Sequence, residues 1–213
     1  MTNIEINQDT DALVVIDAQN DFCPGGALEV TNGDEVVAPI NNLIDRFKHV
    51  LLTQDWHPAE HISFASMHEG QNPFETIELD YGIQVLWPNH CVHGTSGAEF
   101  HADLNVDAAE LVIRKGYRQT IDSYSALYEN DHSTPTGLAG YLRDRGFKRL
   151  FMVGLATDYC VAYSALDGRR ENFEVFVIED ACRGIDLEGS VDAAWQQMTD
   201  AGVQRINAAT LSS

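Results

Sequence analysis

The sequence is short of basic residues, cysteines and long apolar runs, and each shortage excludes a class of protein. Thirteen lysines and arginines stand against 33 aspartates and glutamates, which gives a formal net charge of −20. A chain of this charge repels phosphate backbones and anionic lipid headgroups, so we expect no nucleic-acid partner and no membrane partner. No apolar stretch approaches the ~18 residues of a membrane-spanning helix. The N-terminal residues lack the basic and apolar segments of a secretion signal, and we therefore expect a cytoplasmic protein.

The few cysteines are widely spaced and form no CxxC pair. They are Cys23, Cys91, Cys160 and Cys182. In a chain of 213 residues this usage indicates reduced thiols rather than a disulfide framework. Because that length fits one large domain and the chain contains no repeat, low-complexity tract or linker, we predict a single domain over residues 1–213.

Apolar runs of strand length alternate with helical patterns along the chain. Predicted strands cover residues 13–16, 49–53, 111–113, 150–153, 175–178 and 203–206, and predicted helices cover 35–47, 136–145, 161–170 and 190–201. Residues 54–109 are rich in histidine, proline, glycine and aromatics without a strong period, which is typical of a long functional loop. Continuous Val, Ile and Leu strands between helices favour a parallel sheet covered on both faces. We therefore predict an α/β protein of three α/β/α layers with a doubly wound, mainly parallel six-stranded sheet.

Polar residues follow four of the predicted strands, and the carboxyl ends of parallel strands meet at one edge of a sheet. Asp17 follows the first strand, Asp55 and His57 the second, Lys115 the third and Cys160 the fourth. At the start of a helix, unpaired amides and the positive dipole end favour a thiolate, so Cys160 is a candidate nucleophile. Asp17 is a candidate acceptor of its proton, and Lys115 a candidate cation beside the thiolate. The alternatives are a buried structural cysteine and a structural ion pair at the sheet edge.

A second group of residues has the composition of a metal site. Asp55 and His57 are two apart, so in an extended segment they project to the same side. His90 in the long loop is a candidate third ligand, and His61 is a candidate fourth ligand or neighbour of the site. One carboxylate and two imidazoles suit Zn²⁺, Fe²⁺ or Mn²⁺. We predict one divalent ion, with zinc as the first choice.

Aromatic residues lie next to these candidates in the sequence and are predicted to bind the substrate. They are Phe22, Trp87 and Tyr124, with Trp56 and Tyr159 less well determined. Flat apolar walls suit a planar ligand, although any one of these rings is equally compatible with a core position.

Five motifs spread over nearly the whole chain carry a family resemblance. They are residues 15–22 (VIDAQNDF), 54–58 (QDWHP), 87–92 (WPNHCV), 114–116 (RKG) and 154–160 (GLATDYC). With these motifs the chain resembles the nicotinamidases of the isochorismatase-like cysteine hydrolase superfamily. The motifs QDWHP and WPNHCV are the more specific ones, because many relatives in the superfamily lack the metal.

The resemblance implies the isochorismatase-like hydrolase fold and the hydrolysis of nicotinamide to nicotinate and ammonia, a step of NAD salvage, with pyrazinamide as a further substrate. It implies that Cys160 attacks the carboxamide to form a thioester, that Asp17 moves the proton, and that Lys115 holds both groups in register. The oxyanion hole would consist of the backbone amides of Ala156 and Cys160, with a non-proline cis peptide bond before Ala156.

The resemblance also implies a metal held by Asp55, His57 and His90 that binds the pyridine nitrogen. The same comparison places Phe22 and Tyr124 in the packing around the ring, together with Trp87.

Two other readings stay open from the sequence. One is another branch of the superfamily, an isochorismatase or a carbamoyl or ureido amidase, which generally lacks the Asp55, His57 and His90 combination. The other is a non-catalytic relative that binds a metal or ligand. The expected partner is a small molecule. The sequence leaves the metal identity, the metal contact of His61, the role of Tyr159 and the breadth of amide substrates open, and a homo-oligomer is compatible with it.

Overall fold

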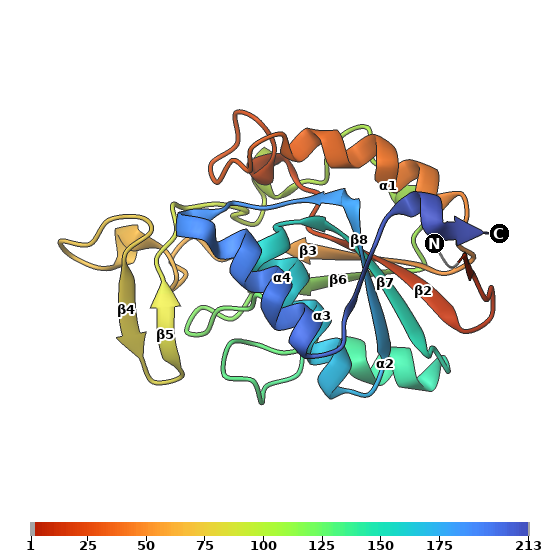
Figure 1. Ribbon diagram of the computed structural model, residues 1–213. Helices are drawn as coiled ribbons and strands as arrows, with labels where there is room; N and C mark the ends of the chain where they lie inside the picture. The colour runs from red at the N-terminus through yellow and green to blue at the C-terminus, as the bar shows by residue number, and fades with distance from the viewer. Residues whose placement is uncertain (1–2, 213) are drawn as a thin grey trace.

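The computed structural model describes residues 3–212 and has a parallel sheet at its centre (Figure 1). Met1, Thr2 and Ser213, which the predicted domain includes, lie outside the described residues. The strands of the central sheet are β2 (Asp11–Ile16), β3 (Val50–Asp55), β6 (Leu111–Lys115), β7 (Arg149–Leu155), β8 (Glu174–Arg183) and β9 (Gln204–Ile206). Every neighbouring pair of them is parallel. The predicted six-stranded parallel sheet is confirmed for the described residues.

Helices cover both faces of the sheet and form the outer two layers (Figure 1). The helices are α1 (Val37–Ile44), α2 (Leu138–Asp144), α3 (Ala162–Arg170) and α4 (Ser190–Asp200). Alternate residues of β2 face opposite layers: Leu13 packs in the core with α1, and Val14 packs in the core with α2, α3 and α4. The inner strands β2, β3 and β7 are buried on both sides and largely apolar, and each buried aliphatic side chain contributes about 1.5–3 kcal/mol. The edge strands β6 and β9 carry exposed polar residues.

The strand order β6-β3-β2-β7-β8-β9 reverses direction at the centre of the sheet. From β2 the chain moves outward through β3 to β6, then returns to β7 on the other side of β2 and moves outward through β8 to β9. Ligands of open α/β sheets bind beyond the carboxyl ends of the strands at such a reversal. Gly154 allows β7 to approach β2 closely there, since a Cβ at this position would lie 2.0 Å from the Ile16 carbonyl oxygen.

The long region between β3 and β6 contains regular structure that the sequence analysis missed. Strands β4 (Thr76–Leu79) and β5 (Gly82–Val85) form an antiparallel hairpin that projects from one end of the molecule (Figure 1). Near the chain ends, β1 (Ile4–Glu5) pairs in parallel with β10 (Leu211–Ser212). Short 3-10 turns lie at Asn20–Phe22, Gly33–Val36, Ala65–Met67, Ser96–Ala98, Val106–Ala108, Leu187–Gly189 and Ala208–Thr210.

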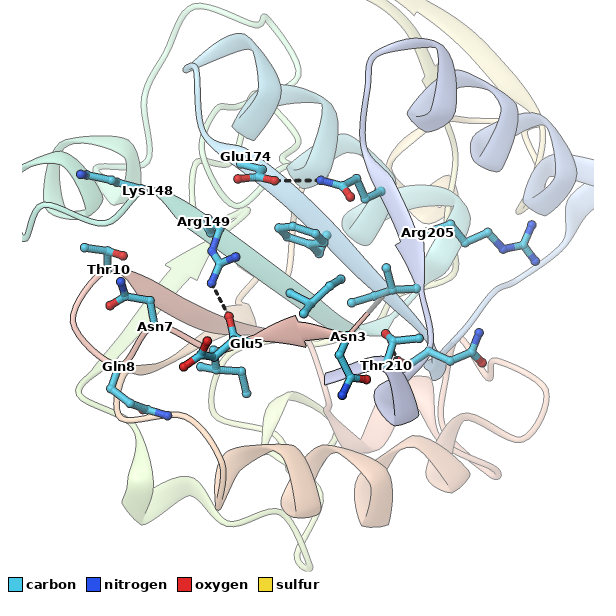
Figure 2. A pocket seen from close by; sticks show the side chains of 16 residues that line it. Asn3, Glu5, Asn7, Gln8, Thr10, Lys148, Arg149, Glu174, Arg205 and Thr210 are labelled. Carbon is cyan, nitrogen blue, oxygen red and sulfur yellow. Dashed lines mark hydrogen bonds between the residues drawn. The ribbon is translucent and has the colours of Figure 1, made fainter. Parts of the chain in front are cut away.

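A polar groove lies at the amino ends of β7, β8 and β9, the opposite edge from the strand-end residues described above (Figure 2). Within the groove, Arg149 donates to the Glu5 carbonyl oxygen, and the Gln204 side chain donates to that of Glu174. Its lining residues include no histidine and no cysteine. Among residues 3–212, no helix combines the length and the apolar character needed to cross a membrane.

Candidate active site

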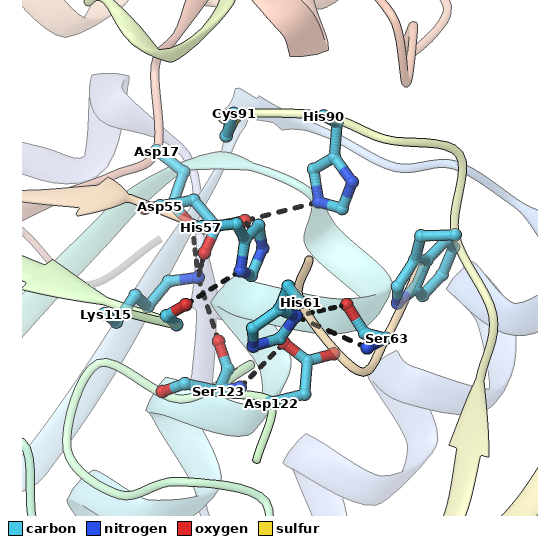
Figure 3. A network of polar contacts seen from close by, with 12 residues as sticks. Asp17, Asp55, His57, His61, Ser63, His90, Cys91, Lys115, Asp122 and Ser123 are labelled. Carbon is cyan, nitrogen blue, oxygen red and sulfur yellow. Dashed lines mark hydrogen bonds and ion pairs between the residues drawn. The ribbon is translucent and has the colours of Figure 1, made fainter. Parts of the chain in front are cut away.

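Four polar side chains from different strands meet at the carboxyl edge of the sheet. Figure 3 shows three of them, Asp17, Asp55 and Lys115. Asp17 follows β2, Asp55 ends β3, Lys115 ends β6, and Cys160 follows β7. The register pairs Asp55 directly with Lys115. All four are buried, Asp17 and Lys115 completely. The structure therefore brings together the residues that the strand-end argument predicted to converge.

Lys115 lies at the centre of this group. Its ammonium nitrogen Nζ is 2.8 Å from Asp17 Oδ2, 3.0 Å from Asp55 Oδ1 and 3.3 Å from the sulfur of Cys160. It also donates to the Ser123 carbonyl oxygen at 3.0 Å. A single buried cation thus holds two carboxylates and a thiol within reach of one another.

Burial sets the resting protonation states of the candidate nucleophile, Cys160, and the candidate base, Asp17. It raises the pKa of the Cys160 thiol well above the ordinary value, against the opposing charge of Lys115 and with the added charge of Asp17. The sequence analysis expected the positive end of the helix dipole to favour the thiolate. Desolvation of the buried sulfur has the larger effect and favours the neutral thiol. Burial also raises the pKa of Asp17, with Lys115 opposing, as a carboxylate base requires.

Asp17 is oriented by the neighbouring strand. The Thr53 hydroxyl donates to Asp17 Oδ1 at 2.6 Å and accepts from the Asp17 backbone N–H at 3.1 Å. Asp17 has a φ of 45°, in the left-handed region that Asp and Asn tolerate better than most other residues. This turn at the end of β2 leaves the carboxylate beside Lys115.

Cys160, the candidate nucleophile, lies in a π-helical turn, Thr157–Val161, that joins β7 to α3. Helical winding thus begins several residues before the predicted helix start at residue 161, and Cys160 lies inside the turn. The peptide bond between Leu155 and Ala156 is cis, as the family resemblance implied. Asp158 anchors the turn by accepting from the backbone N–H groups of Ile185 and Asp186 at 3.0 and 2.8 Å.

Asp55, His57 and His90 form a buried group that could hold a metal ion. Asp55 Oδ2 is 3.0 Å from His57 Nε2 and 3.3 Å from His90 Nε2. The Nδ1 atom of each imidazole lies against a carbonyl oxygen, Gly116 at 2.9 Å and Pro88 at 2.8 Å. Because a carbonyl only accepts, each Nδ1 carries the proton and each Nε2 presents a lone pair to the carboxylate.

Three acceptors that face one another in this way repel unless a cation lies among them, so these residues fit a divalent metal ion. Despite strong desolvation, the Lys115 ammonium 3.0 Å from Asp55 Oδ1 favours a lowered pKa for Asp55, so the carboxylate is ionised. Gly116 leaves room for the imidazole, since a Cβ there would lie 2.5 Å from His57 Cε1.

His61 lies beside this group with a different set of contacts. Its ring centroid is 4.2 Å from that of His57, and its Nδ1 is 2.7 Å from the Ser63 hydroxyl. It belongs to a second buried cluster with His57 and Asp122. Burial lowers the pKa of His61 to about 4, so its imidazole is neutral near pH 7.

A cavity opens directly onto the sulfur and the metal-binding group. Its lining comprises Phe22, Leu28, Asp55, His57, Trp87, His90, Asp122, Ser123, Tyr124, Ala156, Tyr159, Cys160 and Ile185. The three predicted substrate-binding aromatics are all among them. Trp87 packs edge-on against Tyr124 at 6.1 Å and against Tyr159 at 4.8 Å between ring centroids. The cavity thus has apolar walls with a few polar groups at its base, which is typical of a small-molecule site.

Leu28, Asp122, Ser123 and Ile185 also line the cavity, although the sequence analysis did not single them out. Asp122 and Ser123 directly precede Tyr124, which was predicted to bind the substrate, so their position beside it in the sequence could have identified them. Ile185 reaches the site only because its backbone N–H is held by Asp158, a long-range contact with no local sequence signal.

Comparisons with known proteins identify the family. The isochorismatase domain family matches residues 11–210. The nicotinamidase of Acinetobacter baylyi is 53% identical over 92% of this chain and 92% of its own length.

The solved structures of similar proteins lead to the same family. A nicotinamidase pyrazinamidase structure from Acinetobacter baumannii is 58% identical, covers 94% of this chain and 97% of its own, and superposes with a TM-score of 0.93. The structure of a Pyrococcus horikoshii pyrazinamidase in complex with zinc is 37% identical, covers 92% of this chain and 98% of its own, and has a TM-score of 0.74. The sequence, the fold and the site therefore place this chain in the isochorismatase family.

Proposed function

We propose that this protein hydrolyses nicotinamide to nicotinate and ammonia, and pyrazinamide in the same way. One observation carries the proposal: a buried cysteine and an Asp/His/His group open onto the same aromatic cavity. The cysteine provides a nucleophile for a carboxamide, and the metal-binding group provides an attachment for a ring nitrogen. The names of the similar proteins support the same substrates.

In the proposed reaction Asp17 removes the proton from the Cys160 thiol as the sulfur attacks the carboxamide carbon. The buried Lys115 ammonium stabilises the thiolate that forms, 3.3 Å from the sulfur. The backbone amides of Ala156 and Cys160 would stabilise the oxyanion of the tetrahedral intermediate. Asp17 then returns the proton to the leaving nitrogen, ammonia departs, and a thioester remains. Water hydrolyses the thioester to nicotinate and regenerates the thiol.

One divalent ion is proposed at Asp55, His57 and His90, and zinc is the first choice because a related pyrazinamidase structure contains it. Iron and manganese suit the same ligands. When bound, the ion would attract the pyridine or pyrazine nitrogen and so orient the ring. Phe22, Trp87 and the neighbouring aromatics would hold the ring faces. The cytoplasmic location and a homo-oligomeric assembly stay predictions.

Ammonia release tests the proposal against the other branches of the superfamily. We expect purified protein to release ammonia from nicotinamide and to lose this activity on dialysis against a chelator. Cys160→Ala should lose turnover while its metal content stays that of the wild type. Cys182→Ala, which removes a buried thiol outside the cavity, is the matched control and should retain activity. Activity that a chelator leaves unchanged would indicate a metal-independent amidase.

A further inference from the structure

The hairpin β4–β5 carries a buried polar side chain toward the cavity. Gln84 on β5 is completely buried, whereas its neighbour Ile83 is 79% exposed. This is the reverse of the arrangement that a surface strand normally shows, with its apolar residues inward. Because buried polar groups are almost always hydrogen-bonded, a buried glutamine in place of an aliphatic residue implies specific hydrogen-bond partners.

The Gln84 amide is bonded on both sides. Its two Nε2 N–H groups are shared among three acceptors, Asp122 Oδ2 at 2.8 Å, the Tyr124 hydroxyl oxygen at 3.0 Å and the Val85 carbonyl oxygen at 2.7 Å. Its Oε1 accepts from the Tyr81 hydroxyl at 3.1 Å. The carboxylate and the carbonyl only accept, so they fix which end of the amide is nitrogen.

Tyr124 is held at its hydroxyl by two donors from different segments. Besides Gln84, the Trp87 indole N–H donates to the same oxygen at 3.2 Å. The Tyr124 backbone N–H donates to Asn130 Oδ1 at 2.9 Å, and the Asn130 amide in turn donates to Gln84 Oε1 at 3.3 Å. The ring of Tyr124 and the ring of Trp87 both line the cavity. The relative orientation of the Tyr124 and Trp87 rings therefore depends on the Gln84 amide, which itself does not line the cavity.

We propose that Gln84 is a positioning residue for substrate binding, acting through the hydroxyl of Tyr124 to hold the aromatic wall of the cavity in the orientation that accepts a planar ring. The hairpin is then a part of the substrate site rather than a surface insertion. This inference rests on the proposed function for its substrate. It predicts an effect on binding rather than on chemistry, because none of the hydrogen bonds of Gln84 involves Asp17, Lys115 or Cys160.

The test replaces Gln84 with methionine, which has a similar length but no hydrogen-bonding amide. We expect Gln84→Met to raise the KM for nicotinamide about 3- to 10-fold, the effect of one or two lost hydrogen bonds, with kcat within about twofold of wild type. Gln71→Met, which changes an exposed glutamine in the same long region, should leave both constants unchanged. A kcat loss without a KM change in Gln84→Met would overturn the proposal.

A double-mutant cycle asks whether the effect passes through the Tyr124 hydroxyl. If it does, adding Gln84→Met to Tyr124→Phe should raise KM no further than the larger single change, and the losses in thermal midpoint should also be less than additive. Additive effects in both measurements would refute the link. Because the thermal cycle needs no substrate, it tests the link even if wild-type protein does not hydrolyse nicotinamide, a result that would reject the proposed function separately.

Discussion

Replacing Asp17 with asparagine should remove proton transfer while leaving the fold and the cavity in place. Asparagine has the same shape and can still accept the hydrogen bond from the Thr53 hydroxyl, which is 2.6 Å from Asp17 Oδ1. It also tolerates the φ of 45° at this position, where alanine would add strain of about 1–2 kcal/mol. What asparagine cannot do is take the thiol proton from Cys160. The change therefore separates chemistry from structure.

General acid–base catalysis by a positioned side chain contributes about 10²- to 10⁴-fold, which corresponds to about 3–5 kcal/mol of transition-state stabilisation. We expect Asp17→Asn to lower kcat/KM for nicotinamide by this factor, measured as ammonia release under steady-state conditions. Nicotinamide binding, measured by calorimetry, should stay close to wild type, and the thermal midpoint should fall because the buried Lys115 keeps only Asp55 as a charged partner. If the variant keeps more than about a tenth of wild-type kcat/KM, Asp17 is not the base.

Three further predictions concern charge in the site. Lys115→Met removes a cation 3.3 Å from the sulfur, a Coulomb energy of about 5 kcal/mol at an effective dielectric constant of about 20. Alkylation of Cys160 by iodoacetamide at neutral pH should therefore slow by roughly three to four orders of magnitude. An unchanged rate would show that Lys115 does not stabilise the thiolate. Asp17 acts when it is ionised, and burial raises its pKa above the ordinary 3.8. We therefore expect kcat/KM to fall as the pH decreases through that raised pKa. A pH–rate profile that stays flat down to pH 3.8 would exclude Asp17 as the base. The net charge of −20 repels the nicotinate anion but not neutral nicotinamide. Added salt screens this repulsion, so it should strengthen inhibition by nicotinate and leave the KM of nicotinamide unchanged. Inhibition that weakens with salt would show that the charge of the protein attracts nicotinate to the site.

The sheet and the residues at its carboxyl edge could be predicted because their signals are local. A buried parallel strand is a short apolar run, and a polar residue that closely follows it, such as Asp17 or Lys115, must lie at the edge of the sheet. Parallel pairing then brings strand ends together whatever the loops do. The same reasoning located Cys160 but not its resting protonation state, since the degree of burial is a property of the whole fold.

The hairpin β4–β5 was missed although its sequence alternates apolar and polar residues. Alternation would also have assigned the wrong face, because Gln84 is buried and Ile83 is exposed. Gln84 turns inward to satisfy Asp122 and Tyr124, which come from a segment distant in the chain. Partners of that kind are set by tertiary structure, and a single sequence carries no signal for them.

The central claim is that the sulfur of Cys160 becomes covalently attached to the acyl group of the substrate. Intact-protein mass spectrometry of samples quenched in acid during turnover of nicotinamide tests it directly. We predict an added nicotinoyl mass that maps to the peptide containing Cys160 and is absent from Cys160→Ala. Sustained ammonia release by Cys160→Ala, with no acyl adduct on the wild-type protein, would contradict the account.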